Sequence, residues 1–492
     1  MAQSFDSQEI VMIIFFLALP LLFIIFKKSL IKHQSDDPPL PPGPKSWPIL
    51  STINHLLHPK TDHISLSHLS QTYGPLMHIN LGSQHLIVAS SPAAALEVLK
   101  ANDRVLSGRY APASLPKTPA QTDTLSFWAD STSAHWKNLR TVCRAELFTG
   151  KALERSARVR AEKAAEMVAE VMVKSKEGGG VAVDVEKMVF ETVVNMSSNA
   201  YFSKDVDVAQ FAEMLRGIGE IFTAINLSDL YPFLGVLDLQ GLRRKYMGIS
   251  MKMWELWKPI LEERRERMDL RHNDFLDTLI ARGFGDEQIN HLLEDLFTGG
   301  IHTTTAVIKK TMIELLTTPT AMAKLKEELS AAAIFDGQDS IPDLEKLPYL
   351  SACIKETLRL HPPAPLMLGH RAYAACRVMN HTVPKNAQVL VNVWAIGRDP
   401  AVWEAPLEYR PERFVSGGAD FKGNDFELLA FGAGRRICPG MSAAVKMVDV
   451  VVASLLSFFD WSAPHHLHLH QLWNRETSQF NAPLLLIPTP TK

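Results

Sequence analysis

The sequence predicts a mainly helical domain with small β-sheets at its edge, preceded by one helix that anchors the chain in a membrane. Residues 135–330 carry an almost continuous helical pattern, strand-like runs lie at 76–90 and 386–396, and an unbroken apolar run spans 10–26. Of the 492 residues, 46% are hydrophobic and 21% are charged. This composition is sufficient for one large buried core.

The apolar run at 10–26 has the length of a short membrane span and suits the thin bilayer of the endoplasmic reticulum. Asp6 and Glu9 precede the run and Lys27 follows it, which favours a cytosolic body. We therefore expect a lumenal N-terminus at 1–9 and a single-pass anchor. A cleaved signal peptide is the alternative, but no small-residue cleavage site follows the run.

The segment at 27–48 is basic and then rich in proline. Its last part, PPLPPGPKSWP, favours a stiff polyproline II conformation that would space the body from the membrane. Residues 49–492 then form one domain, in which no internal repeat appears.

Several elements of that domain can be predicted in order. Two strands are expected at LMHINLG and HLIVAS, and the long helical region should be interrupted by a glycine run and by prolines. A later strand and a final hairpin are also expected. The positions of these later features are 178–180 for the glycines, Pro232 and Pro259 for the prolines, 386–396 for the strand and 484–488 for the hairpin.

Charge and cysteine content exclude some classes of protein. The formal net charge is -2 and no basic run occurs, so nothing favours a nucleic-acid partner. The cysteines are scattered, contain no CxxC pair and do not form a disulfide framework, which indicates a reducing compartment. They are Cys143, Cys353, Cys376 and Cys438.

The strongest chemical signal is FGAGRRICPG, at 431–440, which ends directly before an apolar helix predicted at 441–459. A helix N-terminus and backbone N–H groups favour a thiolate at Cys438. An ionised cysteine in a tight loop suits a single bond to a soft metal. A buried structural cysteine is the alternative, but it does not explain the surrounding phenylalanine, glycines and arginines.

This segment resembles the haem-thiolate signature F-x-x-G-x-R-x-C-x-G of the cytochrome P450 superfamily. The signature is complete in Phe431, Gly434, Arg436, Cys438 and Gly440. The proline-rich hinge and the sequence GAGRRICPG resemble those of plant microsomal members. The resemblance implies the cytochrome P450 fold, with 49–492 as the haem-thiolate catalytic domain.

Further motifs follow in the family's order. KETLRLHPPAP resembles the E-x-x-R helix, with Glu356 and Arg359, and RPERF supplies Arg413 to the same buried ion triad. AHWKNLR resembles the W-x-x-x-R motif, which implies that Trp136 and Arg140 lie at a haem propionate.

The family's chemistry gives further expectations. His370 and Arg436 align with additional propionate partners, although Arg371 is an alternative to His370. Cys438 would bind the iron of haem b, with O2 as co-substrate and electrons from NADPH. Those electrons would come through NADPH–cytochrome P450 reductase in the endoplasmic reticulum membrane.

The stretch TGGIHTTT interrupts a long helical pattern with residues that weaken a helix. It resembles the family's oxygen-binding motif A/G-G-x-D/E-T-T/S. In that register Gly299 and Gly300 let haem and oxygen approach the backbone, and Thr303 is the catalytic threonine. His302 replaces the usual acid. The histidine could relay protons, could be a structural histidine bonded to a neighbour, or could mark altered chemistry.

The chain looks most similar to plant members that act on alkaloids, so a small hydrophobic alkaloid is the expected substrate. The family pattern places Ile301, Ala306, Leu366 and Phe480 at the substrate. Oxidative rearrangement or phenol coupling without oxygen insertion is an alternative reaction. Monoterpenoid hydroxylation and a non-catalytic haem-binding scaffold are further alternatives.

Overall fold

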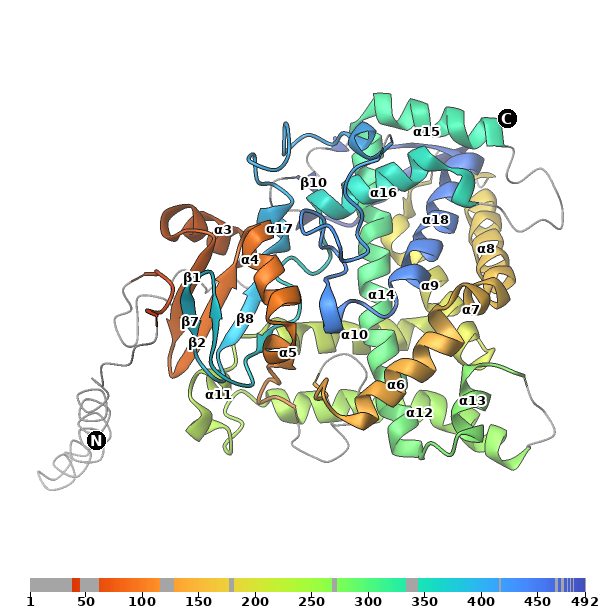
Figure 1. Cartoon of the computed structure of the whole chain (residues 1–492). Helices are drawn as coiled ribbons and strands as arrows, with labels where there is room; N and C mark the ends of the chain where they lie inside the picture. The colour runs from red at the N-terminus through yellow and green to blue at the C-terminus, as the bar shows by residue number, and fades with distance from the viewer. Residues whose placement is uncertain are drawn as a thin grey trace, which may run out of the picture.

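The computed structural model describes most of the chain. The predicted anchor at 10–26 and most of the segment at 27–48 lie outside the described residues. Within them the protein is mainly helical with small sheets, as the sequence predicted (Figure 1). The described residues are 38–44, 62–115, 128–176, 181–267, 272–332, 344–415, 417–464, 468–469, 473–475, 477, 479–480 and 482–491.

The longest helix, α14, runs through the middle of the molecule (Figure 1). It packs with α8, α9 and α18 in a bundle and also contacts α16. The helices are α3 (Asp62–Tyr73), α4 (Pro92–Leu96), α5 (Asp103–Leu106), α6 (Ala134–Cys143), α7 (Gly150–Arg155), α8 (Ala157–Lys176), α9 (Val185–Phe202), α10 (Val208–Thr223), α11 (Leu227–Leu230), α12 (Leu242–Glu266), α13 (Phe275–Ala281), α14 (Asp286–Thr317), α15 (Pro319–Ala332), α16 (Pro348–Leu360), α17 (Val393–Ile396) and α18 (Met441–Phe458).

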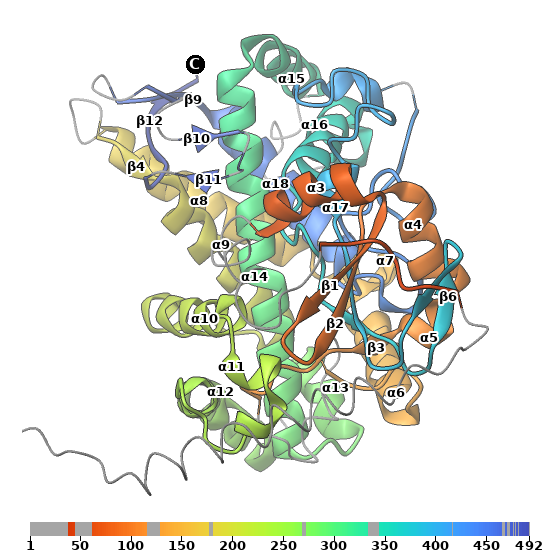
Figure 2. The same ribbon diagram turned by 90° about the vertical axis from the view of Figure 1, so that its left-hand side faces the viewer.

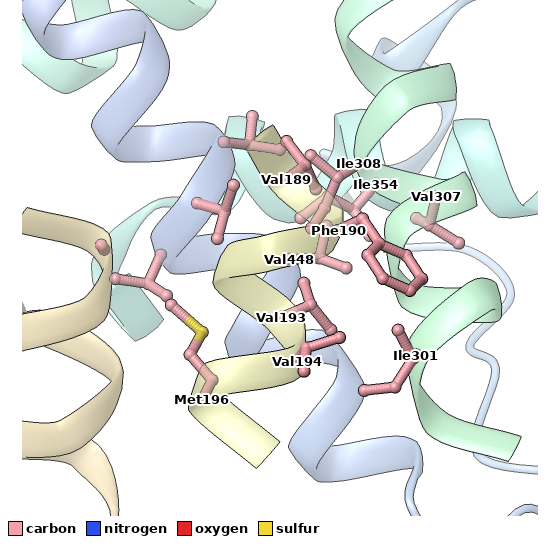
Figure 3. Close-up of a cluster of buried hydrophobic side chains, with 14 of the residues drawn as sticks. Val189, Phe190, Val193, Val194, Met196, Ile301, Val307, Ile308, Ile354 and Val448 are labelled. Atoms are coloured by element: carbon pink, nitrogen blue, oxygen red, sulfur yellow. The ribbon is translucent and has the colours of Figure 1, made fainter. Parts of the chain in front are cut away.

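The bundle is held together by interlocking aliphatic side chains. Val193 and Val194 of α9, Ile301 and Ile308 of α14, and Val448 of α18 are all buried in one cluster (Figure 3). Burial of each such side chain contributes roughly 1.5–3 kcal/mol. The cluster therefore fixes the position of α14, which carries the residues of the TGGIHTTT stretch.

The largest sheet has the strand order β1-β2-β8-β5-β3 and lies to one side of the helices (Figure 2). The two predicted strands near its edge are confirmed as β1 and β2. The strands are β1 (Leu76–Leu81), β2 (Gln84–Ala89), β3 (Gly108–Arg109), β4 (Val183–Asp184), β5 (His370–Arg371), β6 (Cys376–Val378), β7 (His381–Val383), β8 (Gln388–Val391), β9 (Phe459–Ser462), β10 (Trp473–Asn474), β11 (Gln479–Phe480) and β12 (Leu485–Pro490).

Two predicted strands need correction. The run at 386–396 begins as β8 but continues as α17, because the side chain of Asn392 accepts a hydrogen bond from the Ala395 N–H at 3.0 Å and caps a helical turn. The run at 484–488 forms a strand, β12, but not a local hairpin. It pairs with β9 and β4, which are distant partners that alternation within a single strand does not reveal.

The predicted break at Pro232 is confirmed, since a short 3₁₀ turn begins there. The predicted break at Pro259 is wrong, because α12 continues through it. Trp257 is almost completely buried beside this proline, and its indole N–H donates to the Asn290 side chain at 3.0 Å. Tertiary packing on α14 therefore holds the helix together in spite of one missing N–H.

Of the described helices, only α18 is long and apolar enough to cross a membrane. Its buried residues belong to the helix bundle, where it packs against α8 and α14. Its apolar composition is thus explained by core packing.

Candidate haem-thiolate site

The cysteine loop is folded back on itself just before α18. The Cys438 N–H donates to the Phe431 carbonyl at 2.9 Å, which closes the loop that the sequence identified. Gly434 has φ +66°, and a Cβ there would lie 2.1 Å from the Leu99 carbonyl oxygen. Only glycine satisfies both conditions, so the loop and the residues before α5 are held in close contact.

The protonation of Cys438 is set by opposing effects. Burial raises the pKa of the Cys438 thiol, whereas the N–H groups of Gly440 and Met441 and the charge of Arg140 lower this pKa. The groups expected to favour a thiolate are therefore present, but burial outweighs them in the protein alone. A metal ion bound to the sulfur would reverse this balance, because a coordinating thiol is deprotonated.

A cluster of positive side chains lies beside the cysteine loop. Arg436, in a short turn of the loop, has its guanidinium carbon 4.8 Å from the ring centroid of Trp136. Arg140 follows Trp136 by one turn of α6. Its guanidinium carbon lies 5.3 Å from the centroid of the same ring, and its side chain donates to the Ile437 carbonyl. The structure thus brings both residues of the W-x-x-x-R motif to the cysteine loop.

His370 enters the same cluster from β5. Its Nδ1 hydrogen-bonds the Leu106 carbonyl at 2.8 Å. Burial, together with the charges of Arg109 and Arg436, lowers the pKa of His370 to about 3. Arg371 instead points outward over the ring of Tyr373, at 5.8 Å. The structure therefore brings His370, and not Arg371, to the cluster.

Arg109 on β3 is a member of the cluster that the sequence analysis did not name as a site residue. It donates to the Leu368 carbonyl at 2.7 Å. Burial lowers the pKa of Arg109 to about 9, and the charges of Arg436 and Arg140 contribute to the lowering. Its only signal in the sequence is the segment SGRYAP, and the pairing of β3 with β5 that brings it to the site is not visible there.

This cluster fits the anionic groups of a haem. Arg436 donates to the carbonyls of Ser107 and Ala129, but its Nη1 nitrogen is buried with no hydrogen-bond partner in the described chain. The buried guanidinium of Arg436 with its unsatisfied donor, beside two half-buried guanidinium groups, is destabilising unless an anion pairs with the cluster. Carboxylates of a haem, placed beside Cys438, would satisfy this requirement.

The predicted ion triad is assembled behind the site. Arg359 donates to both oxygens of Glu356 at 2.7 Å, and Arg413 donates to the same carboxylate at 3.0 Å. Arg359 also donates to the carbonyls of Pro406 and Glu408, so both of its terminal nitrogens have hydrogen-bond partners. Glu356 and Arg359 are fully buried, and together they link α16 to the segment that precedes the cysteine loop.

On α14 the threonines of the TGGIHTTT stretch bond back to the weakened turn. Thr303 donates to the Gly299 carbonyl at 2.8 Å, and Thr304 donates to the Gly300 carbonyl at 2.7 Å. A Cβ at Gly300 would meet nothing closer than the Tyr201 hydroxyl at 4.0 Å, so packing within the protein does not demand glycine there.

An apolar pocket joins this part of α14 to the cysteine loop. Thr303 of α14 and Phe431 of the cysteine loop both line this pocket. The Phe431 carbonyl accepts the hydrogen bond from the Cys438 N–H, so the pocket adjoins the cysteine. The pocket is lined by Thr303, Thr304, Val307, Ile354, Leu358, Pro363, Ala430, Phe431, Ala444, Val445 and Val448.

His302 is not part of that pocket. Its ring lies 5.6 Å from the ring of Phe190 on α9, and the backbone of Leu215 is near enough to influence its pKa. Burial by these neighbours lowers the pKa of His302, although the side chain still reaches accessible space. Of the three interpretations, this geometry favours a histidine bonded to its neighbours.

The four predicted substrate residues occupy different environments. Ile301 is fully buried in the core against α9, so it has no surface to offer a substrate (Figure 3). The family motif gave its position along the helix but not the face that it occupies. Ala306, Leu366 and Phe480 are partly buried, and Phe480 lies 4.1 Å below the ammonium of Lys309.

Comparison with known proteins agrees with this geometry. The profile of the family described as Cytochrome P450 matches residues 41–486. The chain is 41% identical to the probable (S)-N-methylcoclaurine 3'-hydroxylase isozyme 2 of Coptis japonica, covering 95% of this chain and 96% of the relative. It is 38% identical to the corytuberine synthase of Coptis japonica, covering 90% of each.

Another relative is the (S)-N-methylcoclaurine 3'-hydroxylase isozyme 2 of Eschscholzia californica, with 38% identity over 95% of this chain and 96% of the relative. The family match and these full-length similarities imply the use of haem iron and O2. The chain therefore belongs to the cytochrome P450 family and is a monooxygenase.

Proposed function

We propose that this chain is a membrane-bound haem-thiolate monooxygenase of plant specialised metabolism that oxidises an alkaloid. Electrons come from NADPH through NADPH–cytochrome P450 reductase, and residues 10–26 anchor this chain in the endoplasmic reticulum membrane, where that partner lies. The observation that carries the haem site is the buried Arg436 guanidinium, with one nitrogen unsatisfied beside the Cys438 loop. The alkaloid substrate class is supported by the names of the relatives.

In this proposal Cys438 supplies the sulfur that binds the iron of haem b. When bound, the haem iron supplies the activation of O2 that oxidation of an unactivated C–H bond requires. The propionates would be held by five side chains that can pair with them by charge or by hydrogen bonds. These side chains are Trp136, Arg140, His370, Arg436 and the newly identified Arg109.

The remaining residues act by position. Phe431, beside the cysteine loop, would pack against the cofactor, and Gly300 would let it approach the backbone of α14. Thr303 holds a proton at its Oγ1, which the bond to the Gly299 carbonyl orients, and would support proton delivery in the pocket. Ala306, Leu366 and Phe480 are proposed to contact the substrate.

A second candidate reaction is rearrangement or coupling of the alkaloid without oxygen insertion. One observation favours it: His302 stands where the family has an acid, and it lies outside the pocket that Thr303 lines. Proton delivery would then depend on Thr303 and water alone.

The haem-thiolate assignment is tested by the reduced carbon-monoxide spectrum of the purified chain. The wild type is expected to give the spectrum of a thiolate-bound haem, and Cys438→Ser is expected to lose it. Cys376→Ser, a change at a partly buried cysteine of β6, is the matched control and should keep the spectrum. A Cys438→Ser variant with the wild-type spectrum would show that another residue holds the iron.

A further inference from the structure

A second cavity lies on α14, separate from the apolar pocket beside the cysteine loop. It lies where α10 and α12 cross the N-terminal half of α14 (Figure 1). Its lining combines aromatic rings with carboxylates, in contrast to the other pocket. The lining residues are Trp128, Ile218, Phe222, Tyr246, His291, Glu294, Asp295 and Thr298.

Glu294 is the charged group that distinguishes this cavity. Its side chain is almost completely buried, and its oxygens accept hydrogen bonds from the Tyr246 hydroxyl at 2.5 Å and the Ser250 hydroxyl at 2.6 Å. No lysine or arginine of the described chain forms an ion pair with it. A carboxylate that is buried with only neutral donors is costly, because hydroxyl groups do not neutralise its charge.

The other acidic residue of the cavity is Asp295. Its charge raises the pKa of Arg109, so a cation lies within its electrostatic reach. His291 is the remaining titratable side chain at the cavity wall. Glu294 differs because in the described chain its carboxylate is held only by hydroxyl groups, so its charge is the one offered to a ligand.

The aromatic rings complete the chemistry of a cation site. The rings of Trp128 and Phe222 lie 5.6 Å apart, and those of Phe222 and Tyr246 lie 6.3 Å apart, so the three form one continuous wall. Aromatic faces attract ammonium groups, and desolvation strengthens the attraction. A buried carboxylate beside such a wall is the arrangement that binds a protonated tertiary amine.

Thr298 gives an independent sign of a missing ligand. Its hydroxyl oxygen is buried at the same cavity and has no hydrogen-bond partner in the described chain. Thr298 precedes Thr303 by five residues, which is about 7.5 Å along a helix axis. A ligand in this cavity therefore lies about one and a half helical turns from Thr303 along α14.

We propose that Glu294, with the aromatic wall of Trp128, Phe222 and Tyr246, binds the protonated amine of the substrate and so selects basic alkaloids over neutral compounds. This inference rests on the proposed alkaloid monooxygenase function and adds its selectivity determinant. Thr298 accepts a hydrogen bond from the ligand at the end of the cavity that leads toward Thr303.

The test compares two probes of similar shape by equilibrium dialysis against the haem-loaded full chain at pH 7. The cationic probe is 1-benzyl-N-methyltetrahydroisoquinoline, and the neutral probe is 1-benzyl-N-acetyltetrahydroisoquinoline. We expect the wild type to bind the cationic probe at least about tenfold more tightly, the factor that one desolvated charge pair can contribute. Glu294→Gln should abolish this preference and leave binding of the neutral probe unchanged.

Two further variants separate charge from folding. Glu294→Asp keeps the charge and should retain part of the preference. Glu220→Gln removes a carboxylate from the exposed side of α10, where it pairs with Lys245 at 2.7 Å, and should retain all of it. The reduced carbon-monoxide spectrum checks that each variant is folded.

The inference is wrong if the wild type shows no preference for the cationic probe, or if Glu294→Gln weakens both probes equally. The outcome also separates this inference from the function on which it rests. If the wild type has no cation preference but oxidises neutral aromatic compounds, the monooxygenase assignment is supported and the proposed amine-binding site is refuted. Cation preference that depends on Glu294, without turnover of any amine, would leave the binding site standing and contradict alkaloid oxidation.

Discussion

The guanidinium carbon of Arg436 lies 4.8 Å from the ring centroid of Trp136, and the Nη1 of the same guanidinium is buried without a hydrogen-bond partner in the described chain. Arg436→Leu should therefore reduce the amount of haem bound per protein several-fold, because the charge that pairs with a propionate is lost. Haem content after gel filtration is the measurement. Arg435→Leu, at the exposed neighbour that pairs with Asp103, is the control and should change haem content little.

The ion triad should matter for stability rather than for chemistry. Glu356→Ala leaves Arg359 buried without its bidentate partner, which should lower the free energy of unfolding by about 3–5 kcal/mol. Glu220→Ala removes an exposed partner of Lys245 and should lower the free energy of unfolding far less. Urea unfolding of both variants provides the comparison, and equal losses would count against a scaffold role for the triad.

Thr303 should control how efficiently electrons are used. Thr303→Ala removes the hydroxyl that the Gly299 carbonyl orients, so product formed per NADPH should fall several-fold while hydrogen peroxide rises. Thr304→Ala removes an equivalent bond one residue further on and should have a smaller effect. A variant at Thr303 with unchanged coupling would show that its hydroxyl does not deliver protons.

The exchange His302→Asp tests the role of the unusual histidine. Because His302 packs beside Phe190 and lies outside the apolar pocket, we expect rate and coupling to change by less than about twofold and the product to stay the same. A large gain in coupling would show that this position acts in proton delivery. A changed product would favour altered chemistry.

Stability should depend on pH through His78, far from the cysteine loop. Burial lowers the pKa of His78 to about 4, and the charge of His85, 2.9 Å from it, also lowers this pKa. Between about pH 6.5, the ordinary histidine pKa, and about pH 4, the folded chain therefore binds fewer protons at His78 than the unfolded chain does. Stability should fall as the pH falls through this window, by roughly 1 kcal/mol per pH unit.

His78→Gln should weaken this dependence, and His68→Gln, at an exposed position on α3, should leave it unchanged. Thermal unfolding at pH 7, 6 and 5 measures the slopes. A slope that is the same in the wild type and in His78→Gln would assign the acid sensitivity to other groups.

The sequence predicted the parts of this protein that depend on local pattern and missed those that depend on long-range pairing. The Cys438 loop could be recognised because its glycines, arginine and cysteine are contiguous. Pro259 was expected to end a helix, but burial of Trp257 beside it overrides the local preference.

Arg109 and Glu294 could not be recognised for a related reason. Arg109 reaches the site through the pairing of β3 with β5, and Glu294 reaches its cavity through the crossing of α12 over α14. Ile301 shows the converse, since its motif position was clear but the face of the helix that it occupies was not.

The most direct test of the central claim uses the protein in microsomes with reductase, NADPH and isotopically labelled dioxygen. A panel of basic alkaloids and neutral monoterpenoids is screened by product mass. The account predicts a product from a basic alkaloid that is heavier by one labelled oxygen atom. A product without label, isomerised or lighter by two hydrogens, would contradict oxygen insertion and establish rearrangement or coupling instead.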